Sequence, residues 1–222
     1  MFPLRDSEQS QSRPYITMIL IAINLLVFAY QLSLDGFSLN HFFETWGTVP
    51  GRLEPITLLT AMFLHGGWMH LLGNVWFLWV FGDNIEDILG RANFLTFYLL
   101  SGLGGGLAHV AFNSGSMIPA IGASGAISGV MGAYLMRFPK SRIQTLLFFF
   151  VFATTIEVQA SLMIGYWFVV QLFSGFGQLA SSSATGGGTA WFAHIGGFVA
   201  GLALIRILPQ RPAWRIRQEY RW

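Results

Sequence analysis

Six apolar segments dominate this 222-residue chain and restrict it to a membrane fold. A membrane-spanning helix needs about 20 mainly apolar residues, and in lipid it must satisfy its own backbone hydrogen bonds. Only 10% of the residues are charged, against roughly 25% in soluble domains. We therefore expect an all-α, polytopic membrane protein with six transmembrane helices. The apolar segments are Tyr15 to about Leu34, the sixties to Gly82, about Asn93 to Phe112, Ser124 to Met136, a span within Ile143 to Phe173, and Trp191 to about Leu208.

The positive charges predict the orientation of these spans. The chain has twelve Lys and Arg residues, and a cytoplasmic N-terminus leaves only Arg52 on the outside. Because cytoplasmic loops are enriched in Lys and Arg, both termini are expected in the cytoplasm. Residues 1–14 then form a cytoplasmic N-terminal segment, residues 15–208 the membrane domain, and residues 209–222 a basic cytoplasmic tail. The tail is either an anchor to anionic lipid or a solvated basic end.

The fifth segment is too long for one simple span and contains Glu157. A carboxylate in the middle of the membrane is costly and usually functional. The favoured interpretation starts the helix near Gln159 and ends it near Phe176. The preceding residues then lie at the cytoplasmic interface, with Glu157 among the lipid headgroups, and a buried functional glutamate is the alternative.

Composition and motifs exclude several kinds of chemistry. The chain has no cysteine, which removes disulfides, thiol nucleophiles and cysteine-based metal sites. None of its five histidines belongs to the His-Glu-x-x-His motif of zinc proteases. Asp83 and Asp87 lie at the inner end of one segment and Asp35 lies outside, so a membrane pair for aspartyl chemistry is missing. We expect no metal, no cofactor and, with a net charge of only +2, no nucleic-acid partner.

Polar side chains from three segments share one depth, in the outer part of the membrane. Ser124 opens the fourth segment after an outer loop, and His194 lies near the outer end of the sixth. His70 and Asn74 are one turn apart on the second segment, which also enters from outside. Because unpaired polar groups are expensive in lipid and face the bundle interior, we expect these four residues to converge.

A serine and a histidine that converge from different helices form a candidate nucleophile and base. The imidazole takes the hydroxyl proton as the oxygen attacks a carbonyl, and then returns it to the leaving amine. Ser124 is the predicted nucleophile and His194 the general base and acid. The Asn74 amide, the His70 ring and the Ser124 backbone N–H are candidate donors to the oxyanion, at a helix end that favours negative charge.

Glycine patterns on the fourth and sixth segments suggest a structural role as well. Gly125-x-x-x-Gly129 and Gly197-x-x-x-Gly201 are typical of closely packed membrane helices. Taken alone, the serine is a packing residue and the histidine a structural hydrogen-bonding residue. Taken together, close packing of the two helices would bring the serine hydroxyl within reach of the imidazole.

These residues resemble the motifs of the rhomboid intramembrane serine proteases. Four pieces occur in the family's order within roughly residues 57–207: "HGGWMHLLGN" (65–74), "GDNIEDILG" (82–90), "GASG" (122–125) and "AHIGG" (193–197). By this resemblance Ser124 is the nucleophile, His194 the base, and His70 with Asn74 the family's His-x-x-x-Asn. The remaining motif positions are His65, Gly82, Glu86, Gly122, Gly125, Gly197 and Gly201.

The resemblance implies a fold and an activity. The fold is the six-helix rhomboid core, with a short fourth helix that begins at a water-filled cavity open to the outside. The activity is serine endopeptidase cleavage, by a Ser–His dyad without an aspartate, of transmembrane segments of other membrane proteins near their outer ends. Some members stack a tyrosine on the histidine from the position of Ser128, so here the ring packing must come from elsewhere. Some also have Trp-Arg where this chain has Ile56-Thr57.

Two other functions stay open. Catalytically silent rhomboid-like proteins bind membrane clients, but they typically lack the serine or the histidine. A six-helix transporter would carry polar residues through the full thickness of the membrane. Here the polar cluster lies toward the outside, apart from His109, which we interpret as structural or as facing the lumen.

The expected location is a bacterial or archaeal plasma membrane, because no targeting presequence is visible. The expected partners are the lipid bilayer and transmembrane protein substrates. The sequence leaves the oligomeric state open.

Overall fold

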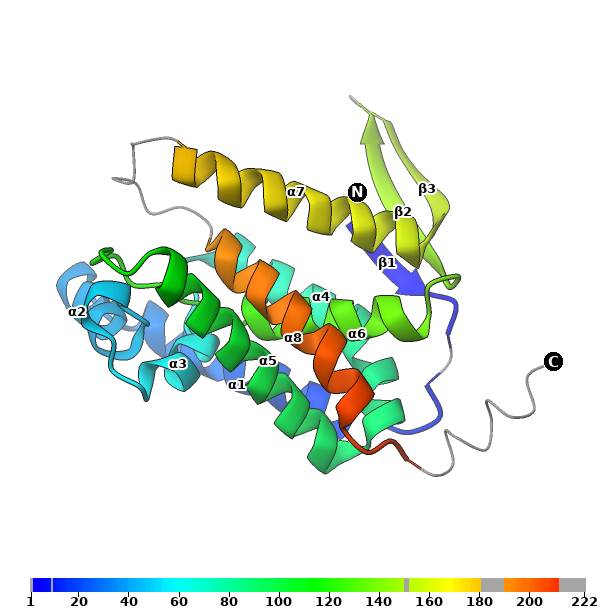
Figure 1. Ribbon diagram of the computed structural model, residues 1–222, viewed down its shortest axis with the longest axis horizontal. Helices are drawn as coiled ribbons and strands as arrows, with labels where there is room; N and C mark the ends of the chain where they lie inside the picture. The colour runs from blue at the N-terminus through cyan, green and yellow to red at the C-terminus, as the bar shows by residue number, and fades with distance from the viewer. Residues whose placement is uncertain (1, 9, 150–151, 181–189, 212–222) are drawn as a thin grey trace.

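Closely packed helices form the centre of the protein in the computed structural model, which describes residues 2–8, 10–149, 152–180 and 190–211 (Figure 1). Two short 3₁₀ turns, Pro50–Arg52 and Ala61–Phe63, lie between the second and fourth helices. The α-helices of the described ranges are α1 (Tyr15–Leu32), α2 (Gly36–Trp46), α3 (Thr57–Thr60), α4 (Trp68–Leu89), α5 (Arg91–Phe112), α6 (Ser124–Arg137), α7 (Ala160–Ala180) and α8 (Trp191–Ile207).

Six of these helices coincide with the six apolar segments of the sequence, namely α1 and α4 to α8. Among the described residues, α1, α5 and residues 160–177 of α7 are long and apolar enough to cross a bilayer, and α8 is apolar but shorter. The largest difference is in α4, which continues past the expected end at Gly82 to Leu89. Its last turns stay helical because their acidic side chains are bonded to other segments of the chain.

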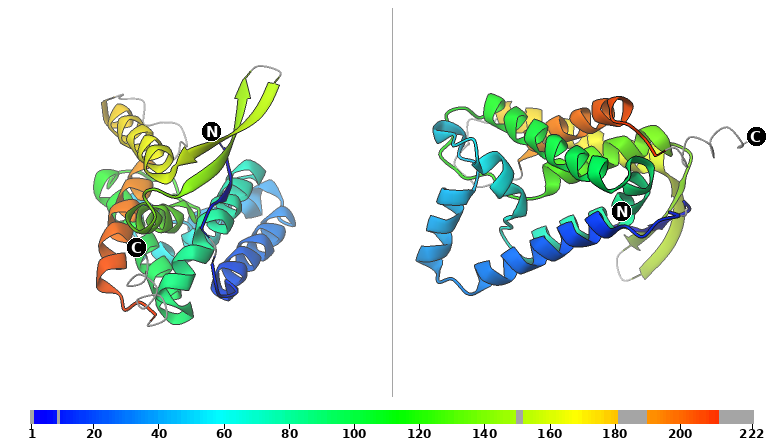
Figure 2. Two further views of the ribbon diagram at one scale, coloured as in Figure 1. Left: turned by 90° about the vertical axis from the view of Figure 1, so that its right-hand side faces the viewer. Right: turned by 90° about the horizontal axis from the view of Figure 1, so that it is seen from below.

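The expectation of an all-α protein is wrong, because three strands form an antiparallel sheet. The order is β1 (Phe2–Asp6), β2 (Arg142–Phe149) and β3 (Phe152–Gln159), with Phe2 opposite Leu146. The hairpin of β2 and β3 extends away from the helices at the start of α7 (Figures 1 and 2). Its sequence is rich in the β-branched and aromatic residues that favour strands. The apolar residues before α7, expected to lie along the membrane interface, therefore form two strands that pair with each other.

Glu157 lies on this hairpin, outside the helices. Its side chain is 60% exposed and forms an ion pair of 3.0 Å with Arg142 of the neighbouring strand. The alternative of a functional glutamate buried in the fifth span is therefore wrong. The helix that follows starts at Ala160, next to the expected start at Gln159.

The glycine and the glutamate of the GDNIE stretch join α1 to α4. Both oxygens of the Glu86 carboxylate accept backbone N–H bonds at the start of α1, from Ile16 at 3.0 Å and from Thr17 at 2.8 Å. The carboxylate thereby satisfies N–H groups that have no partner within their own helix. A Cβ on Gly82 would lie 3.1 Å from the Thr17 side chain. The glycine allows α1 to approach closely, and the glutamate caps it.

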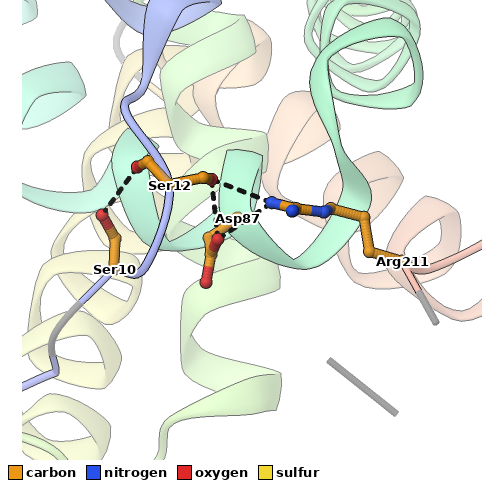
Figure 3. A network of polar contacts seen from close by, with 4 residues as sticks. All are labelled: Ser10, Ser12, Asp87 and Arg211. Carbon is orange, nitrogen blue, oxygen red and sulfur yellow. Dashed lines mark hydrogen bonds and ion pairs between the residues drawn. The ribbon is translucent and has the colours of Figure 1, made fainter. Parts of the chain in front are cut away.

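The C-terminal end of α4 also joins segments near the two ends of the described chain (Figure 3). Asp87 is buried and accepts a hydrogen bond of 2.7 Å from the Ser12 hydroxyl. Arg211 donates to the same Asp87 oxygen at 3.1 Å and to the Ser12 hydroxyl at 2.9 Å. Residues 209–211 of the expected basic tail are thus tied to the bundle, and residues 212–222 lie outside the described residues.

Strand β1 is attached to the helices through Asp6. Its carboxylate accepts hydrogen bonds from the Tyr134 hydroxyl and from the Asn84 amide, the latter at 2.9 Å. Burial of the carboxyl group raises the pKa of Asp6 from 3.8 to about 7, and the nearby carboxylates of Asp83 and Glu8 act in the same direction.

We expect the attachment of β1 to weaken as the pH rises from about 4 to above 7. Because the folded-state pKa of Asp6 is about 7 and the reference value is 3.8, the folded chain binds more protons in this window. Stability is therefore lost as the pH rises through it. Amide hydrogen exchange of the β1–β2 pairs, corrected for intrinsic rates, should show protection falling with pH in the wild type. Asp6→Asn should keep protection constant, and an equal decrease in both proteins would contradict the assignment.

Candidate active site

Two helices cross at glycines and bring a serine next to a histidine. A Cβ on Gly197 would overlap the Gly125 carbonyl, and one on Gly201 would overlap the Gly129 carbonyl. Backbones can approach this closely only where side chains are missing. Ser124 is the first residue of α6, and the crossing puts its Oγ 2.8 Å from Nε2 of His194.

The other ring nitrogen of His194 is bonded as well. Its Nδ1 lies 2.7 Å from Oε1 of Gln171 in α7. An amide oxygen only accepts hydrogen bonds, so Nδ1 carries the proton and Nε2 offers its lone pair to the Ser124 hydroxyl. The histidine is thus held between α6 and α7 in the tautomer that can accept the hydroxyl proton.

Two tryptophans lie against the imidazole ring. The Trp167 ring lies 5.9 Å from the His194 ring at an interplanar angle of 31°, and Trp191 meets it edge-on at 6.2 Å. Ser128 is buried and donates a hydrogen bond of 2.6 Å to the Ser124 carbonyl. The ring packing comes from α7 and from the start of α8.

No motif in the sequence predicts the roles of Gln171 and Trp167. The signal that points to them is a single amide in the apolar stretch YWFVVQLF of residues 166–173. A lone amide within an apolar helix needs a buried partner. The sequence shows that need, but not which neighbour meets it.

His70 and Asn74 of α4 approach the turn that leads into Ser124. Gly122 has a φ of +125°, and a Cβ there would lie 2.6 Å from Nε2 of His70 and 3.7 Å from Nδ2 of Asn74. The Gly122 N–H donates to the Ala61 carbonyl at 2.8 Å, which holds the turn in place. Glycine is required there for both its conformation and its size.

The Asn74 amide has a free donor. Asn74 is 7% exposed, and within the described ranges its Nδ2 has no hydrogen-bond partner. Buried polar groups are normally paired, so a free donor beside a serine is consistent with a group that awaits an acceptor. The first N–H groups of α6, including that of Ser124, also lack acceptors within their helix.

His65 has a different environment from His70. Its backbone is held by the side chain of Gln31 in α1, which accepts from the His65 N–H at 3.0 Å and donates to its carbonyl at 2.7 Å. Its ring is buried and lies 5.2 Å from the His70 ring. His65 therefore supports the segment that leads into α4.

A pocket opens beside Ser124 on the side of α5. Its wall includes Met62, Gly106 and His109, together with Ala193 of α8. The His109 carbonyl accepts a hydrogen bond of 3.0 Å from Asn113 one turn later. His109 is thus one of the residues that line this pocket, and its interpretation as structural or as facing the lumen stays a prediction.

An imidazole bonded to a serine hydroxyl, with its second nitrogen held by an amide oxygen, is an arrangement suited to nucleophilic catalysis. His70 and Asn74 of α4 lie next to Gly122, two residues before the serine. Among the described residues, no group of three His, Asp or Glu side chains is placed to hold a metal ion.

Comparison with known proteins identifies the family. Residues 52–211 match the model of the rhomboid domain. The chain belongs to the rhomboid family. Its mostly helical fold is accordingly that of an integral, multi-pass membrane protein.

Curated relatives of this rhomboid chain include bacterial and plant proteins. It is 33% identical over 197 residues to "Rhomboid protease GluP" of Bacillus subtilis (strain 168). The matched region covers 86% of this chain and 35% of that protein. It is 30% identical over 170 residues to "RHOMBOID-like protein 6, mitochondrial" of Arabidopsis thaliana. This matched region covers 75% of this chain and 48% of that protein. The chain spans about a third to a half of the length of these relatives.

Proposed function

We propose that this rhomboid family member is an intramembrane serine endopeptidase that cleaves transmembrane segments of other membrane proteins near the outer face of the membrane. The observation that carries the proposal is the hydrogen bond of 2.8 Å between Ser124 Oγ and His194 Nε2. Membership of a family in which a bacterial relative is named a protease supports it.

In the proposed mechanism, Ser124 Oγ attacks the carbonyl carbon of the scissile peptide bond while Nε2 of His194 takes its proton. The same nitrogen then returns the proton to the leaving amine, and the acyl-enzyme remains on Ser124. In the second half, His194 takes a proton from water, the resulting hydroxide attacks the ester, and Ser124 recovers its proton. No metal and no cofactor takes part.

The oxyanion of each tetrahedral intermediate is stabilised by donors fixed before the reaction begins. These are the Asn74 amide, the His70 ring and the Ser124 backbone N–H. Donors in a buried site act more strongly than in water and need no reorganisation. The free Nδ2 of Asn74 within the described structure supports this role.

The proposed topology has six spans, α1 and α4 to α8, with both termini in the cytoplasm. Residues 15–208 form the membrane domain, residues 1–14 precede it, and residues 209–222 form the basic tail. Ser124 then opens α6 at the outer side, so substrates are cut near their outer ends. The substrate helix must unwind locally before a serine can reach one of its peptide bonds. This requirement favours helix-destabilising residues near the cut. The proposed location is a bacterial or archaeal plasma membrane.

A client-binding protein without activity would not need the chain of hydrogen bonds that joins Ser124, His194 and Gln171. A transporter would need polar groups along the full membrane path. Neither alternative explains the hydrogen bond between Ser124 and His194, whereas a serine protease requires it.

The test uses the purified protein in vesicles that contain phosphatidylglycerol, with a single-pass substrate that has small residues near its outer end. We expect cleavage within the outer part of the substrate helix, mapped by mass spectrometry. A fluorophosphonate probe should label Ser124, and Ser124→Ala should lose both labelling and cleavage. Asn74→Ala should retain labelling but cleave about 10²–10³ times more slowly. Cleavage that persists in folded Ser124→Ala protein would disprove the mechanism.

A further inference from the structure

We propose that Gln171 is a positioning residue that holds the catalytic histidine in its productive tautomer, so that α7 supplies a third member of the catalytic apparatus. The inference rests on the proposed function and adds the group that orients its base. The dyad then depends on a helix that carries neither the nucleophile nor the base.

Two hydrogen bonds at opposite nitrogens define the state of the imidazole. Oε1 of Gln171 accepts from Nδ1 of His194 at 2.7 Å, and Nε2 lies 2.8 Å from Ser124 Oγ. If the ring rotated by half a turn or changed tautomer, at least one of the two bonds would be lost. The amide therefore excludes the form in which Nε2 carries the proton and cannot act as a base.

Gln171 lies inside an otherwise apolar part of α7, with flanking residues Val170 and Leu172. Its side chain is buried, at 5% exposure. An amide away from water is costly unless it is bonded, and the imidazole is the partner of its carbonyl oxygen. The hydrogen bond to His194 thus offsets part of the desolvation cost of burying this amide in a membrane helix.

The same face of α7 contacts the ring a second time. Trp167 precedes Gln171 by four residues, one helical turn, and its ring lies 5.9 Å from the His194 ring. One side chain restricts the plane of the imidazole and the other restricts its rotation. Orientation of the base is therefore a property of α7, whereas its distance from Ser124 is a property of the α6–α8 crossing.

The neutrality of glutamine suits this location. In soluble serine proteases a buried aspartate holds the histidine tautomer and also stabilises the imidazolium. An unpaired carboxylate in a membrane interior carries a large desolvation cost, whereas an amide can accept the same hydrogen bond without charge. We therefore expect Gln171 to contribute orientation without charge stabilisation, and its removal to cost less than loss of the dyad.

The test compares Gln171→Leu and Gln171→Met, which remove the acceptor, with Gln171→Glu, which keeps one. Val169→Leu on the exposed side of the same helix is the matched control. The readouts are kcat and KM for a model transmembrane substrate, the rate of fluorophosphonate labelling, and thermal unfolding in detergent. Rates are expressed per folded molecule.

We expect the Leu and Met variants to lower kcat and the labelling rate about 10- to 100-fold with unchanged KM. Gln171→Glu should recover at least tenfold over Gln171→Leu, because its oxygen still accepts from Nδ1. A merely structural role predicts equal losses in the Leu and Glu variants, and that result would overturn the proposal. So would wild-type kcat in Gln171→Leu, or failure of all three variants to fold. If Ser124→Ala protein stays active, the proposed function itself fails, whatever the Gln171 variants do.

Discussion

Alanine at Ser124 and alanine at His194 are each expected to remove cleavage, and the double variant should be no worse than either single variant. The two side chains act as one unit through the hydrogen bond of 2.8 Å that joins them. Without the base the hydroxyl keeps its proton, and without the hydroxyl the base has nothing to activate. In serine proteases the loss is about 10⁴-fold or more and is far from additive.

The measurement is the single-turnover cleavage rate of a transmembrane substrate in vesicles for the two single variants and the double variant. Ser128→Ala is the matched control, because this serine lies one turn away and its hydroxyl bonds only a backbone carbonyl in the described structure. We expect the control to retain most activity and all four proteins to unfold at similar temperatures. Losses that multiply in the double variant would show that the two residues act independently.

The second large effect is expected at the glycine crossing of α6 and α8. Gly197→Ala and Gly201→Ala each put a methyl group into the space of a facing carbonyl oxygen, that of Gly125 or Gly129. Backbone atoms cannot move aside as a flexible side chain can, so the helices must separate. Overpacking of this kind costs about 1–3 kcal/mol and occasionally more. Separation should also lengthen the bond between Ser124 and His194, so that activity falls with stability.

Gly165→Ala in α7 is the control for this experiment, because a Cβ there meets nothing within 4 Å. It should leave unfolding unchanged or raise the midpoint slightly, since alanine favours a helix over glycine by about 1 kcal/mol. Thermal unfolding in detergent and the fluorophosphonate labelling rate measure the two consequences. Equal stability of the Gly197→Ala and Gly165→Ala proteins would contradict the close crossing.

Some of the fold could be predicted because depth in a membrane follows from hydropathy. The six apolar segments coincide with α1 and α4 to α8 within a few residues at most ends. Once the order of the spans is known, the start of α6 and the start of α8 must lie at the same side. The order of the spans alone therefore predicts that Ser124 and His194 lie at a similar depth, and their catalytic roles likewise stay a prediction.

The sheet could not be predicted in the same way. An apolar run of strand length is ambiguous between a strand, a helix and an interfacial segment until its pairing is known. Residues 142–159 pair within themselves, and β1 joins them from the far end of the sequence. Asp6 and Tyr134 are 128 residues apart, and no local pattern connects them.

The sequence by itself predicted the six apolar helices, the same-side placement of the starts of α6 and α8, and the positions where glycines permit close approach. Only the tertiary structure decided which side chains meet: Glu86 with the start of α1, and Gln171 with His194. Depth depends on the free energy of transfer of each segment into lipid, which is a sum over local residues. Lateral neighbours depend on how side chains from distant segments pack together, and that information is present only when all the helices are in place.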